Sequence, residues 1–196
     1  LSWFPELGSR TTFAQQAANL WVIKQRLHQQ LLIDLGAVTD PIHLVDGCPM
    51  PVCMLTRAPQ CRCFPEVADF GYCAAKKQYY YGLHGHLRIP FNGVITACAV
   101  TSATGDEREA LWELTEGFQG LLVGDKGYLG AWLQAERATV GIHLQTPLRA
   151  NMIDPRPPWV VRQLTCVRRS VETVIGQLTE QLHFEKIRAR DVWHLT

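Results

Sequence analysis

Three acidic residues that lie far apart in the chain stand in settings from which their side chains can meet. Asp46 and Asp125 each end a short apolar run, and Glu172 lies in a late stretch with the pattern of a helix. Two carboxylates at strand ends and one on a helix can converge on one point and hold two divalent metal ions. Such a pair of ions, about 4 Å apart, clamps the attacking and leaving oxygens of a phosphoryl transfer. The pattern therefore indicates chemistry on a nucleic-acid backbone.

The expected ion is Mg²⁺ (or Mn²⁺), because it prefers oxygen ligands and keeps several waters. In this arrangement Asp46 bridges two ions, and Asp125 and Glu172 hold one each. Each acid also has a simpler interpretation. Asp46 and Asp125 can be ordinary turn residues, and Glu172 can form a surface ion pair with Arg168, four residues before it. Taken singly the simpler interpretations are the commoner ones, and only the joint pattern favours a site.

Basic residues near these acids are candidates for contacts with DNA. Arg168 can orient Glu172 or contact a phosphate through its fork of donors. A solvated surface side chain is the alternative for every candidate. The predicted DNA-binding residues are Lys76, Lys77, His86, Lys126, Arg168 and Arg169.

The composition suits one globular domain, since 47% of the 196 residues are hydrophobic. The net charge of +1 gives no support for DNA binding, because DNA-binding domains are often much more basic. Locally, the segment 145–170 holds five arginines and one acid, Asp154. A basic stretch beside an acidic metal site suits an enzyme that handles phosphates, although a solvated surface run has the same pattern.

The chain shows no signal peptide and no apolar run of the length that a membrane span needs. Seven cysteines in an ordinary composition indicate reduced thiols, and we expect a cytoplasmic protein. A zinc site built from four cysteines is an alternative for the region that holds Cys48, Cys53, Cys61, Cys63 and Cys73. Because the chain starts at Leu1 and stops soon after a helix, we expect a fragment.

The elements that position the three acids follow from hydrophobic periodicity and turn residues. Residues 79–89 alternate as a strand with one polar face, and Asn92-Gly93 is a strong hairpin turn. The strand after that turn is almost continuously apolar, which predicts a central, buried position. Pro157-Pro158 is expected to block an earlier start of the last helix. The expected strands are 42–46, 79–89, 94–101, 121–125 and 142–146, and the expected helices are 11–32, 105–117, 129–140 and 162–182.

This order predicts an α/β fold with a mixed sheet flanked by helices and an N-terminal helix. It matches the ribonuclease H-like fold, in which the first and fourth of these strands are parallel neighbours. Asp46 and Asp125 would then lie side by side. Residues 47–77 are predicted to be a long irregular loop, which in a compact domain is usually functional or a packed insertion.

Several motifs occur in an order that resembles a known family. They are Val45-Asp46 with Pro49-Met50-Pro51-Val52-Cys53, Cys61-Arg62, Phe64-Pro65, Lys76-Lys77-Gln78-Tyr79-Tyr80-Tyr81-Gly82-Leu83, Gly124-Asp125-Lys126-Gly127-Tyr128, Pro157-Pro158-Trp159 and the helix with Val171-Glu172-Thr173. Together they resemble insertion-sequence transposases of the DDE class, named for an Asp-Asp-Glu triad, and in particular the bacterial group called nine-eighty-two.

The resemblance implies a catalytic domain over residues 41–196 with a loop insertion at 47–77. Residues 1–36 would be the helical remnant of a DNA-recognition region. Asp46, Asp125 and Glu172 would be the catalytic metal ligands. The implied activity is metal-dependent cleavage and strand transfer at the ends of an insertion sequence. The implied partners are double-stranded DNA, as terminal repeats and target, and a second copy of the chain in a homodimer of the bacterial cytoplasm and nucleoid.

The sequence departs from the wider family pattern at three positions. Thr165 and Thr179 stand where a Tyr and a Lys are usual, and His84 takes the place of a strand Lys, whereas His86 keeps its place. A loss of basic groups beside the triad keeps two alternatives open. One is a catalytically inactive DNA-binding remnant, and the other is a metal-dependent nuclease of the same fold that performs no strand transfer.

Overall fold

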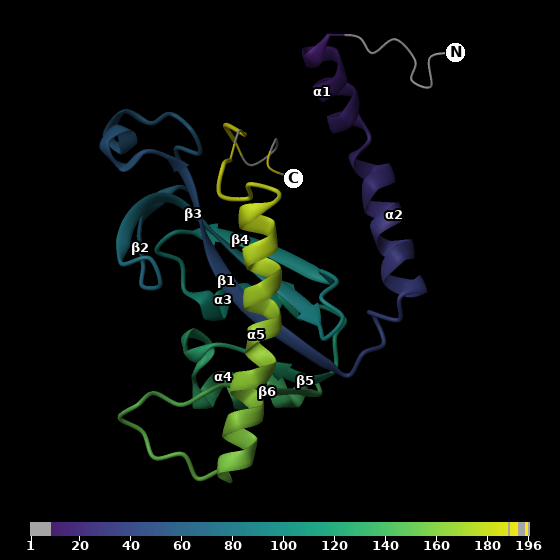
Figure 1. Cartoon of the computed structure of the whole chain (residues 1–196), viewed down its shortest axis with the longest axis vertical. Coiled ribbons are helices and arrows are strands. Elements are labelled where there is room, and N and C mark those ends of the chain that lie inside the picture. The colour runs from purple at the N-terminus through teal and green to yellow at the C-terminus, as the bar shows by residue number, and fades with distance from the viewer. Residues whose placement is uncertain (1–8, 188, 192–194, 196) are drawn as a thin grey trace.

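The computed structural model describes residues 9–187, 189–191 and 195 (Figure 1). As predicted, it is an α/β fold in which a mixed sheet is flanked by helices and preceded by a helical segment. In chain order the elements are α1 (Arg10–Asn19), α2 (Trp21–Asp34), β1 (Ile42–Cys53), η1 (Leu55–Gln60), β2 (Asp69–Cys73), β3 (Gln78–Pro90), β4 (Ala97–Ser102), α3 (Glu107–Leu114), β5 (Gly120–Val123), η2 (Lys126–Tyr128), α4 (Ala131–Thr139), β6 (Ile142–Gln145) and α5 (Pro158–Glu180).

The sheet is built around β1, and its strand order is β2-β3-β1-β5-β6, with β4 paired to β3. β1 is antiparallel to β3, with Asp46 opposite Leu87, and parallel to β5, with Leu44 opposite Val123. The predicted parallel pairing of the strands that precede Asp46 and Asp125 is therefore confirmed. Asp125 follows the last residue of β5 by two positions. Parallel pairing brings both aspartates toward the same end of the sheet.

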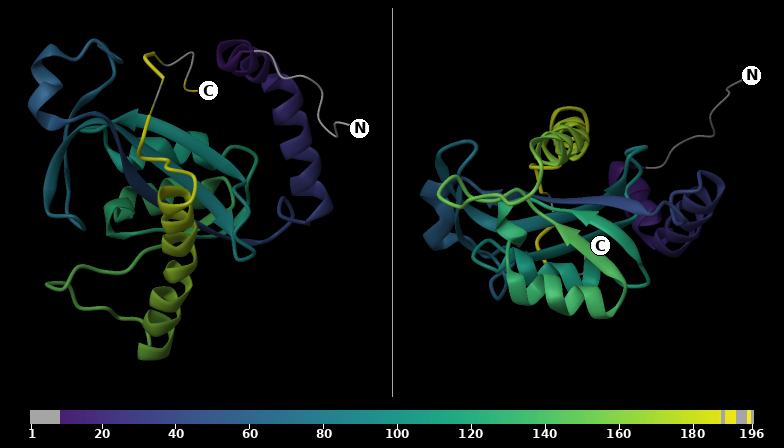
Figure 2. Two further views of the ribbon diagram at one scale, coloured as in Figure 1. Left: turned by 45° about the horizontal axis from the view of Figure 1, so that its top comes forward. Right: turned by 90° about the horizontal axis from the view of Figure 1, so that it is seen from below.

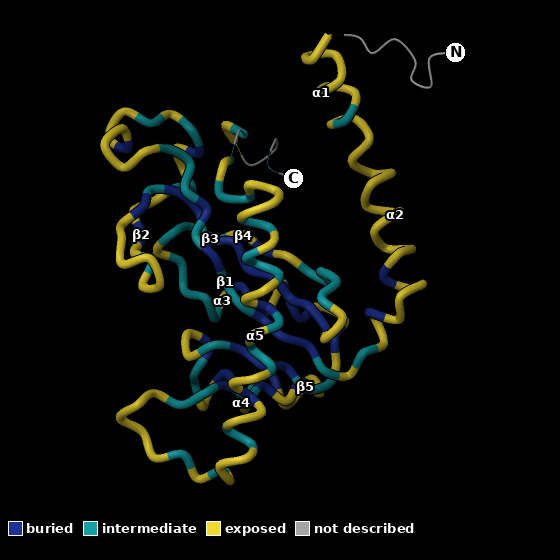
Figure 3. The backbone as a smooth tube through the Cα atoms, in the orientation of Figure 1, coloured by how far each residue is buried: buried dark blue, intermediate teal, exposed yellow. Residues whose placement is uncertain are grey.

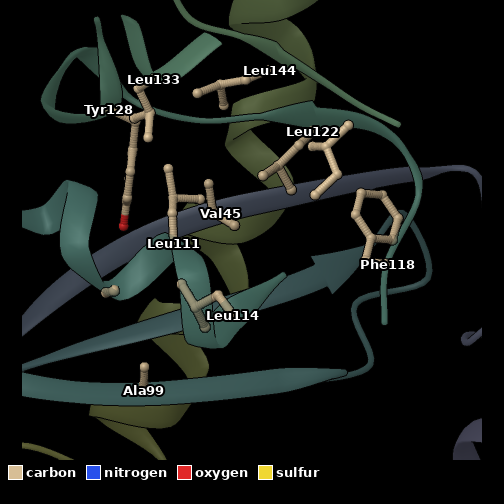
Figure 4. Packing of buried hydrophobic residues seen from close by; sticks show 11 residues of the cluster. Val45, Ala99, Leu111, Leu114, Phe118, Leu122, Tyr128, Leu133 and Leu144 are labelled. Atoms are coloured by element: carbon tan, nitrogen blue, oxygen red, sulfur yellow. The ribbon is translucent and has the colours of Figure 1, made fainter. Parts of the chain in front are cut away.

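Helices cover the two faces of the sheet (Figure 2). α5 lies on one face, and α3 and α4 lie on the other. Alternation along β1 sends Leu44 into the cluster under α5 and Val45 into the larger cluster under α3 and α4 (Figure 4). Each fully buried Leu or Val side chain contributes about 1.5–3 kcal/mol by leaving water. The two clusters therefore fix β1, and with it Asp46, from both sides.

The segment 47–77, predicted to be an irregular loop, is partly regular. β1 continues to Cys53 instead of ending at Asp46, and the rest of the segment holds η1 and β2. The prolines at 49 and 51 had argued against a strand. β5 pairs with β1 only at residues 42–44, so no described strand pairs with that edge of β1 farther along. A proline, which has no N–H group, loses no hydrogen bond of the sheet at such an edge.

The helices at the two ends also differ from prediction. The N-terminal helix is split at Leu20 into α1 and α2, and it starts after Ser9, whose side chain accepts a hydrogen bond from the Thr12 amide at 3.2 Å. α5 begins at Pro158, because proline is favoured in the first turn of a helix, where its missing N–H has no partner to lose. The predicted apolar stripe of the first helix is exposed, as Figure 3 shows for α1 and α2.

β4 is an edge strand and not the central strand predicted from its apolar sequence. Among the described strands it pairs only with β3, and Val100 is 42% exposed. Its apolar residues had suggested burial on both faces, but α3 covers only one of them. Among the described residues, no helix is both long enough and apolar enough to cross a membrane.

Candidate active site

The three predicted acids come from three different elements. Asp46 lies within β1, half-buried, and its Oδ1 accepts a hydrogen bond from the Gly47 amide at 2.9 Å. Asp125 lies directly before η2, and Glu172 lies on α5 with 57% of its side chain exposed. Arg168, one turn before Glu172, is half-buried and lies between Asp125 and Glu172. Its Nη2 is 3.2 Å from Asp125 and 3.6 Å from Glu172.

Asp46 is electrostatically coupled to the other two acids. Burial, together with the negative charges of Asp125 and Glu172, raises the pKa of Asp46 to about 6. The Gly47 hydrogen bond and the Arg168 charge act in the opposite direction. Arg168 thus pairs with two of the carboxylates and acts on the third, Asp46, through its charge, which leaves an excess of negative charge beside Asp46 and beyond the last residue of β5.

The chemistry of this group fits a hard divalent cation. All donors are carboxylate oxygens, which Mg²⁺ and Mn²⁺ prefer. As the side chains stand, no three His, Cys, Asp or Glu residues of the described part of the chain are close enough to hold an ion together. One nitrogen of Arg168 instead bridges Asp125 and Glu172, so a cation from the protein lies between two of the predicted ligands.

Two further residues near this group were not predicted. Glu107 is the first residue of α3, and its Oε1 lies 3.9 Å from Nε2 of His84 on β3. The pKa of Glu107 is raised by burial and by the charges of Asp46 and Asp125. In the sequence nothing separated Glu107 from Glu109 in the same helix. The available signal was that this helix follows β4 directly, so its first turn starts at the edge of the sheet.

The predicted DNA-binding residues differ in burial and in their partners. His86 was predicted to contact DNA, and this is wrong, because its side chain is fully buried and bonded to Tyr128 and Thr101 at 3.1 and 3.0 Å. Lys76 forms an ion pair with Glu185, and Arg168 pairs with the acids. The exposed candidates Lys77, Lys126 and Arg169 stay predictions.

The predicted basic stretch is only partly free. Arg156 is bound to Asp154 at 2.7 Å and to the Thr146 carbonyl at 2.9 Å, so it holds the loop before α5 together. Arg149, Arg162 and Arg169 are exposed. The basic stretch therefore offers fewer unpaired cations than the sequence count suggested.

The cysteines are all free thiols, as the simplest interpretation of the sequence predicted. The Cys61 thiol donates a hydrogen bond to the carbonyl oxygen of Cys63 at 3.9 Å. No group of three metal-binding side chains occurs among the residues that the structure describes, so the zinc alternative is not supported.

Buried histidines under the site predict a loss of stability in acid. Burial, and then the neighbouring His84, lower the pKa of His86 to about 4 from 6.5. Between pH 6.5 and 4 His86 therefore binds a proton in the unfolded chain but not in the folded chain. The free energy of unfolding falls as the pH drops through this range. The loss is at most about 3 kcal/mol, at about 1.4 kcal/mol for each pKa unit.

Urea unfolding at several pH values measures this effect, with His86→Asn as the comparison. The raised pKa of Asp46 acts in the opposite direction over part of this range, and it is present in both proteins. The variant should therefore lose less stability in acid than the parent. Parallel stability profiles for the two proteins would contradict the assignment to His86.

Comparison with known proteins adds the family. Residues 36–192 match the family described as the transposase DDE domain. The chain belongs to this family. The transposase domain thus has a ribonuclease H-like fold, with Asp46 on β1 and Asp125 just after the parallel neighbouring strand β5. The family acts on DNA and generally uses divalent metal ions. No curated protein matches the chain, and membership of the nine-eighty-two group stays a prediction.

Proposed function

We propose that this transposase domain catalyses metal-dependent cleavage and strand transfer at the ends of an insertion sequence. The observation that carries the proposal is that Arg168 pairs with Asp125 and Glu172, and that the charges of all three residues act on Asp46. Such a concentration of carboxylates costs folding energy, since burial and like charges both disfavour ionisation. This arrangement beside two central strands would serve to bind a cation.

Asp46, Asp125 and Glu172 would hold Mg²⁺ or Mn²⁺. When bound, the ions supply an activated nucleophile and stabilise the leaving oxygen of a phosphoryl transfer. Asp46 is fixed by β1 and by its hydrogen bond to the Gly47 amide. Arg168 balances Asp125 and Glu172, and its guanidinium can turn from them to a phosphate, which it binds through two parallel hydrogen bonds.

The substrate would be double-stranded DNA, first as terminal repeats and then as target. The exposed residues Lys77, Lys126 and Arg169 would contact its phosphates, with residues 1–36 as a recognition segment and 41–196 as the catalytic domain. A homodimer on paired ends and a bacterial cytoplasmic location belong to the same proposal. Binding should weaken steeply with salt, because phosphate contacts release counterions. A flat salt profile would argue against a groove that follows the backbone.

Two alternatives give different results in the same assays. An inactive remnant, favoured by Thr165 and Thr179 at the usual Tyr and Lys positions, would bind DNA and leave it uncut. A nuclease of the same fold would hydrolyse DNA and never join a 3′ end to a target.

The first experiment is diffraction from crystals soaked in Mn²⁺. Anomalous signal between Asp46, Asp125 and Glu172 supports the proposal, and its absence at saturating Mn²⁺ overturns it.

Removal of the Arg168 charge should tighten metal binding. In the metal-free domain Arg168 competes with a cation for Asp125 and Glu172. A positive charge about 6 Å from a divalent ion costs about 1.4 kcal/mol even in water, so Arg168→Gln should bind Mn²⁺ about ten-fold more tightly. Titration followed by electron paramagnetic resonance measures the affinity.

Arg169→Gln is the matched control, because this exposed neighbour has the same charge and no ion pair with the acids in the described structure. Equal Mn²⁺ affinities for the two variants would show that Arg168 does not compete with the metal.

A further inference from the structure

Glu107 and His84 lie between the two segments that carry the aspartates. His84 packs against Gly47, the residue after Asp46, so closely that a Cβ atom at position 47 would collide with its Nε2. Glu107 packs in the same way against Gly127, two residues after Asp125, where a Cβ atom would collide with its Oε2. The two glycines thus leave room for these two side chains.

The two side chains also meet each other. Oε1 of Glu107 is 3.9 Å from Nε2 of His84, and this nitrogen is buried and has no hydrogen-bond partner among the described residues. The segment with Gly47 is therefore connected to the segment with Gly127 through His84 and then Glu107. The connection passes directly beside both aspartates.

A second contact, with His86, holds the ring of His84 in place. Its ring stacks on His86, with centroids 4.7 Å apart and planes inclined by 11°. Nδ1 of His86 is 3.1 Å from the hydroxyl of Tyr128, which follows Gly127 and reaches from η2 toward β1 (Figure 4). Because His86 and Tyr128 are fully buried, His84 cannot move away from Gly47 without disturbing the core.

We propose that Glu107 and His84 form a brace that sets the distance between Asp46 and Asp125. They are positioning residues, and they act on the metal site through Gly47 and Gly127. The inference rests on the proposed function, since the affinity that the brace serves is that of Asp46 and Asp125 for a divalent ion. Residues that orient ligands in this way typically change metal affinity by 10- to 100-fold.

The decisive variant is Glu107→Asp, which keeps the charge and shortens the side chain by one methylene. We expect it to weaken Mn²⁺ binding about ten-fold in an electron paramagnetic resonance titration. His84→Gln changes no charge on the neutral ring and should have the same effect. Both substitutions disrupt the same brace. The Mn²⁺ affinity of the double variant should therefore equal that of the single variant with the lower affinity. Glu109→Asp, on the exposed face of the same helix, should bind Mn²⁺ as the parent does.

Two other outcomes overturn the brace. Unchanged Mn²⁺ affinity in Glu107→Asp would show that only its charge matters, and independent, additive losses at positions 84 and 107 would show two separate effects. Circular dichroism confirms that each variant is folded, and His84→Asn replaces His84→Gln if the latter does not fold. Asp46→Asn separates the two proposals. If it binds Mn²⁺ like the parent, the proposed function fails. If it loses binding while Glu107→Asp does not, the brace alone fails.

Discussion

Asp46→Asn should abolish DNA cleavage and leave the fold at least as stable as before. Loss of a metal ligand removes several kcal/mol of transition-state stabilisation, so the rate should fall by about 10³-fold or more. Asn keeps a side-chain oxygen that can accept the hydrogen bond from the Gly47 amide. The pKa of Asp46 is about 6 in the folded state, against 3.8, so above pH 6 its ionisation opposes folding.

The sign of the stability change distinguishes a functional carboxylate from a structural one. At neutral pH without metal, we expect the unfolding free energy of Asp46→Asn to rise by about 1–3 kcal/mol. Urea unfolding and plasmid nicking in Mn²⁺ measure the two effects on the same preparation. Glu116→Gln, which neutralises an exposed carboxylate, should change neither. An Asp46→Asn protein that cuts DNA normally would remove Asp46 from the catalytic site.

Gly120→Ala should destabilise the domain by about 3 kcal/mol or more, because it combines a steric clash with backbone strain. Gly120 has φ +136°, a conformation that L side chains rarely adopt, and its Cβ would collide with the carbonyl oxygen of Pro41. That oxygen accepts the hydrogen bond from Leu121 that starts the pairing of β5 with β1. Thermal unfolding should show a clearly lower midpoint, and metal-dependent cleavage should fall with it.

Gly176→Ala should have the opposite effect on stability from Gly120→Ala. Gly176 lies inside α5, and a Cβ atom there meets nothing within 4 Å. Alanine in place of a helical glycine should raise stability by about 0.5–1 kcal/mol. If both alanine variants melted at the temperature of the parent, the close approach of Gly120 to Pro41 would be incorrect.

The sequence predicted the strands that carry the aspartates because their residues are buried, and burial leaves a periodic apolar pattern. It did not predict β1 beyond Asp46, since prolines at 49 and 51 resemble a loop unless the free edge of the strand is known. The edge position of β4 was missed for a related reason. An apolar run shows that side chains are hydrophobic, but only the fold shows whether a strand pairs with each edge and whether another element covers each face.

The candidate triad could be proposed from the sequence because each acid follows a recognisable run or lies in a regular helix. Glu107 and His84 could not, because their roles depend on contacts across the fold. The room for them is made by Gly47 and Gly127, and a glycine in a sequence does not tell which side chain fills the space beside it. His86 was misplaced because alternation along β3 marks one face as polar without showing that Tyr128 and α3 cover it.

The position of Asp46 inside β1, and of Glu172 on a largely exposed helix turn, has a consequence for hydrogen exchange. The amides of β1 that bond to β3 lie in a strand that is packed on both faces, so they should exchange only when the whole domain unfolds. Amides on the outer side of α5 need only local opening. The strand part and the helix part of the candidate site should thus differ in the free energy of local opening, with the α5 part opening first.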